Sequence, residues 1–295
     1  KNLKAGRSAE LVRDVPQQRI VERISAGATH RSNEKAAELA KNLSARMHNT
    51  KIGSLCGLEC ILRPDEDTQE ENVPRIHFQL QLAELKDKLL AMAALSQQAV
   101  QAAVDAWLQR DEALCQYVRE NETAINTAQR EVDEMAYELL SREQPMAIDL
   151  RFILAVIKIN GDLERIGDMA VSIAIRTLDL LEQDPADLPV DIAGMGDFAG
   201  VMIRTAVQAL LDGDALVAES VRDMDDEIDR MNRVAITDLT KVIQEHPETA
   251  DQALPAILIS RNLERIADHA TNIATDVIFW VRGADLRHQL SLAVD

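Results

Sequence analysis

The sequence predicts an all-α fold of two tandem antiparallel three-helix bundles, and three observations support this prediction. Hydrophobic residues make up 46% of the 295-residue chain and aromatic residues only 3%. Aliphatic side chains must therefore fill the core, which suits helices better than sheets. From Arg75 onward, apolar residues recur at every third or fourth position, which is the helical period. A segment of the first half also recurs in the second half, which indicates a duplicated unit.

The first bundle is expected to occupy residues 75–184. Its first helix is predicted over about 75–110, and its second helix follows a tight corner at Asp111 and reaches about Ser141. The third helix is expected to start near Pro145, because proline suits the first turn of a helix. It should end before the segment EQDPADLPVD, whose prolines mark the clearest domain boundary in the chain.

A linker at 185–192 is expected to lead into the second bundle at 193–285. The same plan then repeats, with a helix to about Leu211, a corner at the sequence DGD, and a helix to about Glu245. The last helix is predicted over about 247–282. No stretch alternates apolar and polar residues as a half-buried strand does. Each bundle is therefore expected to contain three helices in the same order.

Residues 1–72 are expected to form an N-terminal extension that is poorly ordered or partly helical, since they contain no aromatic residue and run into the acidic segment RPDEDTQEENVP. The three cysteines, Cys56, Cys60 and Cys115, form no disulfide framework, which favours a reducing, cytoplasmic location. The net charge of −18 argues against a nucleic-acid partner, which needs a basic surface. No apolar run approaches the roughly 20 residues of a membrane span, so membrane association is expected only through partners.

The repeat is clearest in the third helix of each bundle, where DLERIGDMAVSIA (162–174) is matched by NLERIADHATNIA (262–274). Ten of the twenty aligned positions in 155–174 and 255–274 are identical. In the second helices, VRENETAIN aligns with VRDMDDEID at a slightly larger offset. A duplicated bundle explains both similarities.

Each repeated segment carries two acids four residues apart, although like charges at that spacing repel by about 0.2–0.5 kcal/mol on a helix. On a helical wheel, the apolar stripe of each segment faces the bundle core and the acids fall on the outer side. The predicted outward positions are Glu164 and Asp168 in the first repeat, and a ladder of Glu264, Asp268, Asn272 and Asp276 in the second.

A further pair at the same spacing, Asp225 and Asp229, lies on the middle helix of the second bundle. Carboxylates from two adjacent helices can converge on the groove between them and bind a hard cation, or iron or manganese. The competing interpretation is a solvated acidic face in which Arg165 and Arg265 pair with the acids and leave no place for an ion. His269, beside the ladder, is a candidate auxiliary ligand.

The sequence contains no candidate catalytic constellation. Di-iron bundles use inward-facing Glu-x-x-His pairs, and this sequence has no such pair while its acids face outward. It also lacks a glycine-rich phosphate loop, a G-x-S-x-G elbow and an H-E-x-x-H motif. We therefore predict that the protein is not an enzyme.

These features together resemble the PhoU family, over about Arg75 to the C-terminus. The resemblance is carried by QPMAIDLRFILAVIKINGDLERIGDMAVSIA in the first repeat and RNLERIADHATNIATDVIFWVRGADLRH in the second. It implies a cytoplasmic negative regulator of phosphate uptake and of the phosphate-starvation response. Such a regulator links the ATP-binding subunit of the phosphate ABC transporter to a membrane sensor histidine kinase. The resemblance also implies a homodimer.

The resemblance further implies surface metal sites, for iron, zinc, manganese or magnesium, built from E/D-x-x-x-D motifs. It assigns three such motifs to this chain: Glu164 with Asp168, Glu264 with Asp268, and Asp225 with Asp229. A fourth would begin at Glu122, but Asn126 stands where the motif needs an acid. We therefore expect the first bundle to bind metal more weakly than the second.

Two other interpretations stay open at this point. The chain is alternatively a metal-binding helical bundle with a storage or metalloenzyme role, which would hold many ions or turn over a redox substrate. A third interpretation is a helical adaptor for a phosphate permease of another class. Metal content separates the first alternative from the adaptor, and gene neighbourhood separates the second.

Overall fold

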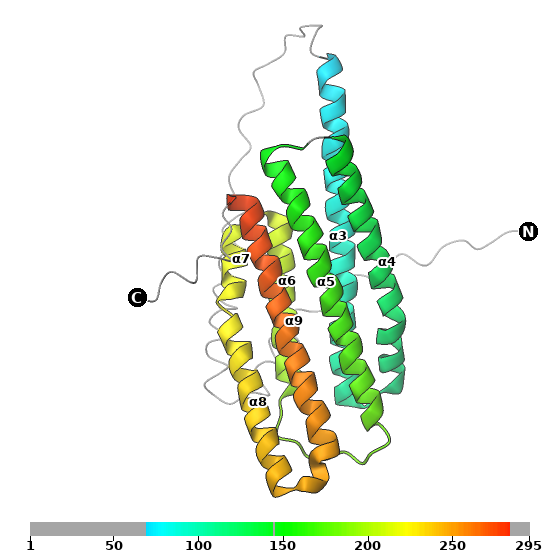
Figure 1. The fold of residues 1–295 in the computed structure, drawn as a ribbon, viewed down its shortest axis with the longest axis vertical. Helices are drawn as coiled ribbons and strands as arrows, with labels where there is room; N and C mark the ends of the chain where they lie inside the picture. The colour runs from blue at the N-terminus through cyan, green and yellow to red at the C-terminus, as the bar shows by residue number, and fades with distance from the viewer. Residues whose placement is uncertain (1–68, 144, 284–295) are drawn as a thin grey trace, which may run out of the picture. The chain divides into compact units, whose positions relative to one another are not determined.

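The computed structural model describes residues 69–143 and 145–283, and every regular element within them is helical (Figure 1). The first bundle comprises α3 (Gln69–Gln109), α4 (Glu112–Arg142) and α5 (Ala147–Leu180). The second comprises α6 (Ile192–Asp212), α7 (Ala215–Arg222), α8 (Asp225–Glu245), the short 3-10 helix η1 (Pro247–Thr249) and α9 (Ala250–Arg282). Strands are absent from these described ranges. The predicted all-α fold class is confirmed.

Most helix ends lie within two or three residues of the expected positions, but α3 begins at Gln69 rather than near Arg75. Residues 1–68 of the predicted N-terminal extension, which include Cys56 and Cys60, lie outside the described residues. The predicted end of the second bundle at 284–285 also lies outside them. None of the described helices combines the length and the apolar character that crossing a membrane requires.

The corner between α3 and α4 is built by two adjacent residues. Asp111 caps α4, because its carboxylate accepts a hydrogen bond from the N–H of Ala113 at 2.8 Å and an acid is favourable at a helix N-terminus. Arg110 adopts a positive φ of 52°. Its guanidinium donates to the carbonyls of Leu180 at 2.5 Å and Gln183 at 2.6 Å. The corner is therefore tied to the end of α5.

The equivalent corner of the second bundle depends on Gly213, which ends α6 with a φ of 63°. Asp214 then caps α7 by accepting from the N–H of Leu216 at 2.8 Å. A Cβ on Gly213 would lie 3.3 Å from the Trp280 ring, so backbone conformation and space both favour glycine here. Trp280 also packs on Phe152 with ring centroids 4.9 Å apart.

The predicted middle helix of the second bundle is interrupted. The chain turns at Asp223 and Met224, so that α7 ends at Arg222 and α8 begins at Asp225. The reason is local: Asp is a poor residue inside a helix, whereas acids in a first turn are stabilised by the helix dipole. Three acids fill the first turn of α8. The aligned segment of α4 contains glutamates instead and stays helical.

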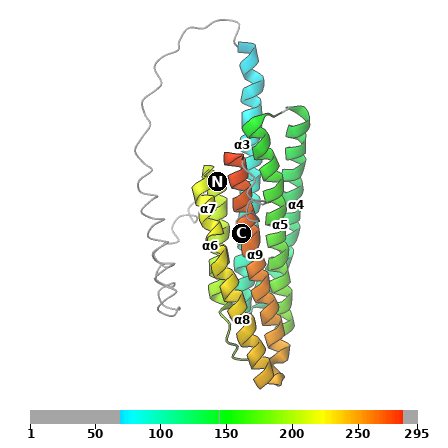
Figure 2. The same cartoon turned by 60° about the vertical axis from the view of Figure 1, so that its left-hand side comes forward.

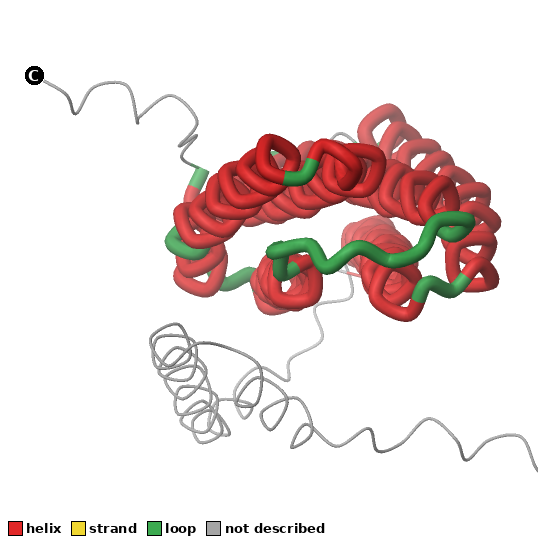
Figure 3. The backbone as a smooth tube through the Cα atoms, turned by 90° about the horizontal axis from the view of Figure 1, so that it is seen from below, coloured by secondary structure: helices red, strands yellow, loops and turns green. Residues whose placement is uncertain are grey.

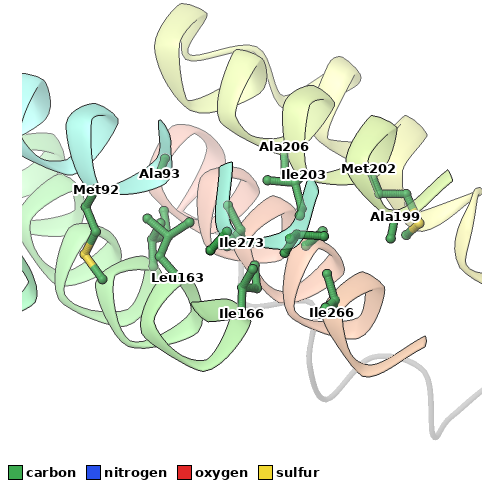
Figure 4. Packing of buried hydrophobic residues seen from close by; sticks show 14 of the residues in the cluster. Met92, Ala93, Leu163, Ile166, Ala199, Met202, Ile203, Ala206, Ile266 and Ile273 are labelled. Carbon is green, nitrogen blue, oxygen red and sulfur yellow. The ribbon is translucent and has the colours of Figure 1, made fainter. Parts of the chain in front are cut away.

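The two bundles share one hydrophobic core. Helices α5 and α9 lie side by side and run in opposite directions, with α3 against α5, α6 against α9 and α3 against α6 (Figures 2 and 3). Helix α4 flanks this group on the first-bundle side, and α7 and α8 flank it on the other. Buried side chains from four helices meet in the centre, among them Met92, Leu163, Ile203 and Ile273 (Figure 4).

The contact between α5 and α9 also contains polar pairs. Lys158 Nζ lies 3.6 Å from Asp276 Oδ1 and 5.0 Å from the centre of the Phe279 ring, and His269 Nδ1 lies 2.7 Å from Asp162 Oδ1. Asp276 is only 2% exposed. Its predicted place in the outward ladder is therefore wrong, because α5 of the other bundle covers that side of α9. A helical wheel identifies the side opposite a helix's own core but not a neighbour that covers it.

A polar groove of about 400 Å³ runs along this contact. Its lining comes from α4, α5 and α9: Gln129, Lys158, Gly161, Asp162, Glu164, Arg165, His269, Asn272 and Asp276. A Cβ added to Gly161 would meet no atom within 4 Å. The missing side chain therefore contributes open space to the groove.

Candidate metal centre

The two acid pairs of the second bundle come together where α8 packs on α9. Asp225 and Asp229 lie on α8 and are partly buried, as is Glu264 on α9, whereas Asp268 is exposed. Partial burial raises the pKa of Glu264 above its usual 4.5, and the charges of Asp268, Asp229 and Asp225 raise it further. The pKa of Asp268 is also raised, mainly by partial burial and then by the charges of Asp225 and Asp229. These four coupled acids are called the second cluster.

Two contacts act on the α8 members of the second cluster. Burial raises the pKa of Asp225, and a hydrogen bond donated by Thr271 Oγ1 to Asp225 Oδ1 at 3.2 Å opposes that increase. Arg233 Nη1 lies 3.4 Å from Asp229 Oδ2. Since the Arg233 side chain is 67% exposed, this ion pair contributes little stability. The second cluster therefore keeps an excess of negative charge.

The corresponding group in the first bundle is smaller. Glu164 and Asp168 on α5 lie near Glu122 on α4. The pKa of Glu164 is raised mainly by partial burial, then by the charge of Asp168, and more weakly by that of Glu122. Asn126 occupies the position aligned with Asp229. We call Glu122, Glu164 and Asp168 the first cluster. It has three carboxylates where the second cluster has four.

Apart from Asp276, the wheel correctly separated core from outer positions in the repeated segments of the two third helices. Leu163 and Ile166 on α5 and their counterparts Leu263 and Ile266 on α9 are all fully buried. Asp168 and Asp268 are exposed, and the glutamates one turn before them are partly buried. The acids therefore lie at the margins of the helix contacts rather than in the core.

The competing interpretation, in which arginines neutralise the acids, is weakened by the geometry. Arg165 and Arg265 are both exposed. Arg165 lowers the pKa of Glu164 and Arg265 lowers that of Asp268, but burial and the neighbouring acids outweigh them in each case. Neither guanidinium forms a direct ion pair with a carboxylate in the described part of the chain. In the second cluster, Arg261 also lowers the pKa of Glu264 and Arg222 that of Asp225, and the pKa of each acid is still raised overall.

The donor set suits a cation, but it is not converged. Carboxylate oxygens are the ligands that magnesium and calcium prefer, and iron and manganese also accept them. As placed, no three His, Cys, Asp or Glu side chains of residues 69–143 and 145–283 form a group that could hold a metal ion. Like charges drive carboxylates apart when no ion lies between them. The residues therefore suit a metal in the chemistry of their oxygen atoms, but the described side chains are not arranged to hold one.

His269 bonds Asp162 on α5, and its charge also lowers the pKa of the neighbouring Asp268. The contact with Asp162 does not support the predicted role of His269 as an auxiliary metal ligand. Two features near the clusters were not anticipated: the break before α8 and the contact of Thr271 with Asp225. The run of acids around Asp225 could have indicated the break before α8. The presence of Thr271 where the first repeat has Val171 could have indicated the contact with Asp225.

The raised pKa values predict how the stability of the cation-free protein depends on pH. A carboxyl whose pKa is higher in the folded than in the unfolded chain contributes stability that is fully present below the unfolded pKa and is lost as the pH rises through the folded one. Wild type should therefore gain stability relative to the variant Asp225→Asn, Glu264→Gln, Asp268→Asn as the pH falls from 7 toward 4.5. Urea unfolding of both proteins in chelator at several pH values measures this difference. A constant difference across that range contradicts the prediction.

Comparison with known proteins places these observations in a family. The family model of the PhoU domain matches residues 89–177 and again residues 192–277. A phosphate-specific transport system accessory protein PhoU homolog from Pseudomonas putida is 41% identical over 212 residues, which cover 72% of this chain and 83% of the relative. The homolog from Pseudomonas aeruginosa is 39% identical over 72% of this chain and 88% of the relative.

Solved structures agree with the sequence relatives. The crystal structure of PhoU from Pseudomonas aeruginosa is similar with a TM-score of 0.68 at 38% identity, covering 70% of this chain and 100% of that one. The phosphate transport system regulatory protein PhoU from Streptococcus pneumoniae gives a TM-score of 0.66 at 26% identity, covering 71% and 99%. The two matches to the family model fall on the two bundles. This chain therefore belongs to the PhoU family.

Proposed function

We propose that this protein is a negative regulator of phosphate uptake and of the phosphate-starvation response. It would act as a non-catalytic cytoplasmic adaptor between the ATP-binding subunit of a phosphate ABC transporter and a sensor histidine kinase, and would assemble as a homodimer. The observation that carries this proposal is the match of both bundles to the PhoU domain. Relatives that cover 72% of the chain are named accessory proteins of the phosphate-specific transport system.

We further propose that the two carboxylate clusters bind metal ions, with iron, zinc, manganese and magnesium as the candidates. Support comes from the coupled acids on adjacent helices and from the excess negative charge around Glu264 and Asp268. A bound cation would neutralise that repulsion and link α8 to α9 through shared ligands. The second cluster would bind more tightly than the first, because Asn126 replaces one carboxylate there.

Deletion of the gene tests the regulatory role directly. Loss of a negative regulator should raise phosphate uptake and the expression of phosphate-starvation genes in phosphate-rich medium. Complementation with the wild-type gene should restore repression, and affinity capture of the tagged protein should recover the transporter ATP-binding subunit or the sensor kinase. Unchanged expression of phosphate-starvation genes after deletion would show that the proposed function is wrong.

Metal content of the purified chain distinguishes the adaptor from a storage protein or metalloenzyme. One to a few ions per chain without redox turnover are expected for an adaptor with structural cation sites. Many ions per chain, or turnover of a redox substrate, would support the alternative role. Elemental analysis after dialysis measures the ratio.

A further inference from the structure

The first half of α9 carries a stripe of exposed side chains. From Asp251 to Arg261, the exposed residues are Asp251, Leu254, Leu258 and Arg261, which we call the α9 stripe. Their spacing of three, four and three residues places them on one side of the helix, as in the seam of a coiled coil. Leu254 is 53% exposed and Leu258 is 42% exposed. The α9 stripe therefore presents two leucines to solvent between an acid and an arginine.

Helix α5 adds an apolar side chain next to the α9 stripe. The polar contacts described above fix the antiparallel register of α5 and α9 near residues 158–162. Gln252 extends this register to the start of α9, because its amide donates to the carbonyl of Asp184 at 2.9 Å. The same register places Ile175, which is 45% exposed, level with Leu258. The exposed apolar surface therefore spans both helices.

The charges at the two ends of this surface are opposite in sign. Asp251 and Arg261 form no ion pair within the part of the chain that the structure describes. Helix α5 has the same polarity. Its Arg176 donates to the carbonyl of Ser172 at 2.7 Å and so points toward the Arg261 end, whereas Asp179 lies toward the Asp251 end. The apolar centre is thus bounded by cations on one side and by carboxylates on the other.

The first bundle does not repeat this pattern, although its third helix is a copy of α9. The four aligned positions on α5 are Arg151, Leu154, Lys158 and Gly161. They contain one leucine and two cations, and no acid. The α9 stripe is therefore not a by-product of the duplication, and the helical fold does not require it.

The order of residues in the α9 stripe is self-complementary. Single exposed leucines are common on protein surfaces, so exposure alone does not identify an interface. If two α9 helices pair antiparallel with Ala256 at the centre, however, Leu254 of each copy faces Leu258 of the other, and Asp251 faces Arg261. A partner with only acidic or only basic side chains would meet a like charge at one end of the stripe. The charges therefore favour a second copy of this chain.

We propose that the α9 stripe, with Ile175 beside it, is the interface of a homodimer in which two α9 helices pack antiparallel about a two-fold axis at Ala256. The proposal rests on the homodimer of the proposed function and identifies the surface that forms it. A two-fold interface uses the same surface of both copies, so every contact occurs twice and every substitution acts twice.

Sedimentation equilibrium of the full chain measures the Kd of the dimer. Leu254→Ala combined with Leu258→Ala should raise this Kd by at least about 100-fold, because losing a central apolar contact costs about tenfold and each loss occurs twice. The matched control replaces two exposed leucines outside the stripe, Leu154 (38% exposed) and Leu216 (62% exposed), by alanine and should leave the Kd unchanged. Circular dichroism confirms that each variant is folded.

A charge exchange tests the antiparallel pairing itself. Asp251→Arg alone and Arg261→Asp alone should each weaken the dimer about tenfold at low salt, since like charges then face each other at both ends. An equal mixture of the two variants should form a heterodimer with nearly wild-type affinity, because each arginine again faces an aspartate. Salt should reduce the effect of each single change, since exposed charges are screened.

Three results would overturn the proposal. If the wild-type dimer is unaffected by loss of both leucines, or if the control weakens it equally, the α9 stripe is not the interface, and the proposed homodimer must use another surface. If the two charge variants do not combine, the antiparallel pairing about Ala256 is wrong. A wild-type chain that stays monomeric at every concentration rejects both this interface and the proposed homodimer, whereas the regulatory role is judged separately by gene deletion.

Discussion

Replacing Glu264 and Asp268 together by alanine is expected to weaken cation binding at the second cluster by at least about 100-fold. Loss of groups that merely support a metal ligand already costs about 10- to 100-fold in affinity, and these two acids are half of the proposed ligands themselves. Helix content should not change, because Asp268 is exposed and Glu264 only partly buried, while the core residues beside them stay in place. Elemental analysis and circular dichroism measure the two quantities.

A matched control is available on α4. Glu134 and Glu138 are both exposed and have the same four-residue spacing, so replacing both by alanine removes the same charge away from either cluster. This variant should keep its cation content. Retained metal in the Glu264→Ala, Asp268→Ala protein would place the site elsewhere, and a loss of helicity would mean that these side chains support the core.

The second large effect concerns two glycines on α5 that should respond to alanine with opposite signs. A Cβ at Gly167 would lie 2.8 Å from Ile125 Cδ1 and 3.3 Å from its Cγ2. Since Ile125 is only 2% exposed, it cannot move into solvent, and overpacking of this kind costs about 1–3 kcal/mol. Gly167→Ala should therefore destabilise the protein, and urea unfolding measures the change.

Gly161 is the matched control, because a Cβ there meets nothing within 4 Å and lies on the groove between α5 and α9. Alanine in a helix interior is favoured over glycine by about 0.5–1 kcal/mol, so Gly161→Ala should raise the free energy of unfolding by about that amount. Equal effects of the two substitutions would show that α4 does not approach α5 as closely as the structure places it.

The sequence predicted the helical architecture well because helix formation depends on local patterns. A three-to-four period identifies the buried stripe. The tight corner predicted at Asp111 is where α4 begins. The duplication predicted a second bundle with the same order of helices. Burial of Leu163 and Ile166 with exposure of Asp168 confirms the wheel at the candidate site.

The sequence could not predict contacts between elements that lie far apart along the chain. Asp276 was expected to face outward, but α5 covers it and Lys158 lies beside it. His269 was expected near the acids of α9, but Asp162 on α5 bonds it instead. Both differences arise because α5 and α9 pack against each other across the two bundles, which periodicity within one helix does not encode.

The sequence by itself thus determined which residues form helices, which side of each helix is apolar, and that two acid pairs recur at matched places on the third helices. Only the tertiary structure decided that both bundles share one core, that Asp225 begins a new helix, and that Thr271 reaches it from α9. The physical reason is that the spacing of apolar residues along one helix fixes which of its faces is apolar. Which other helix packs against each remaining face depends on how several helices bury their apolar stripes together.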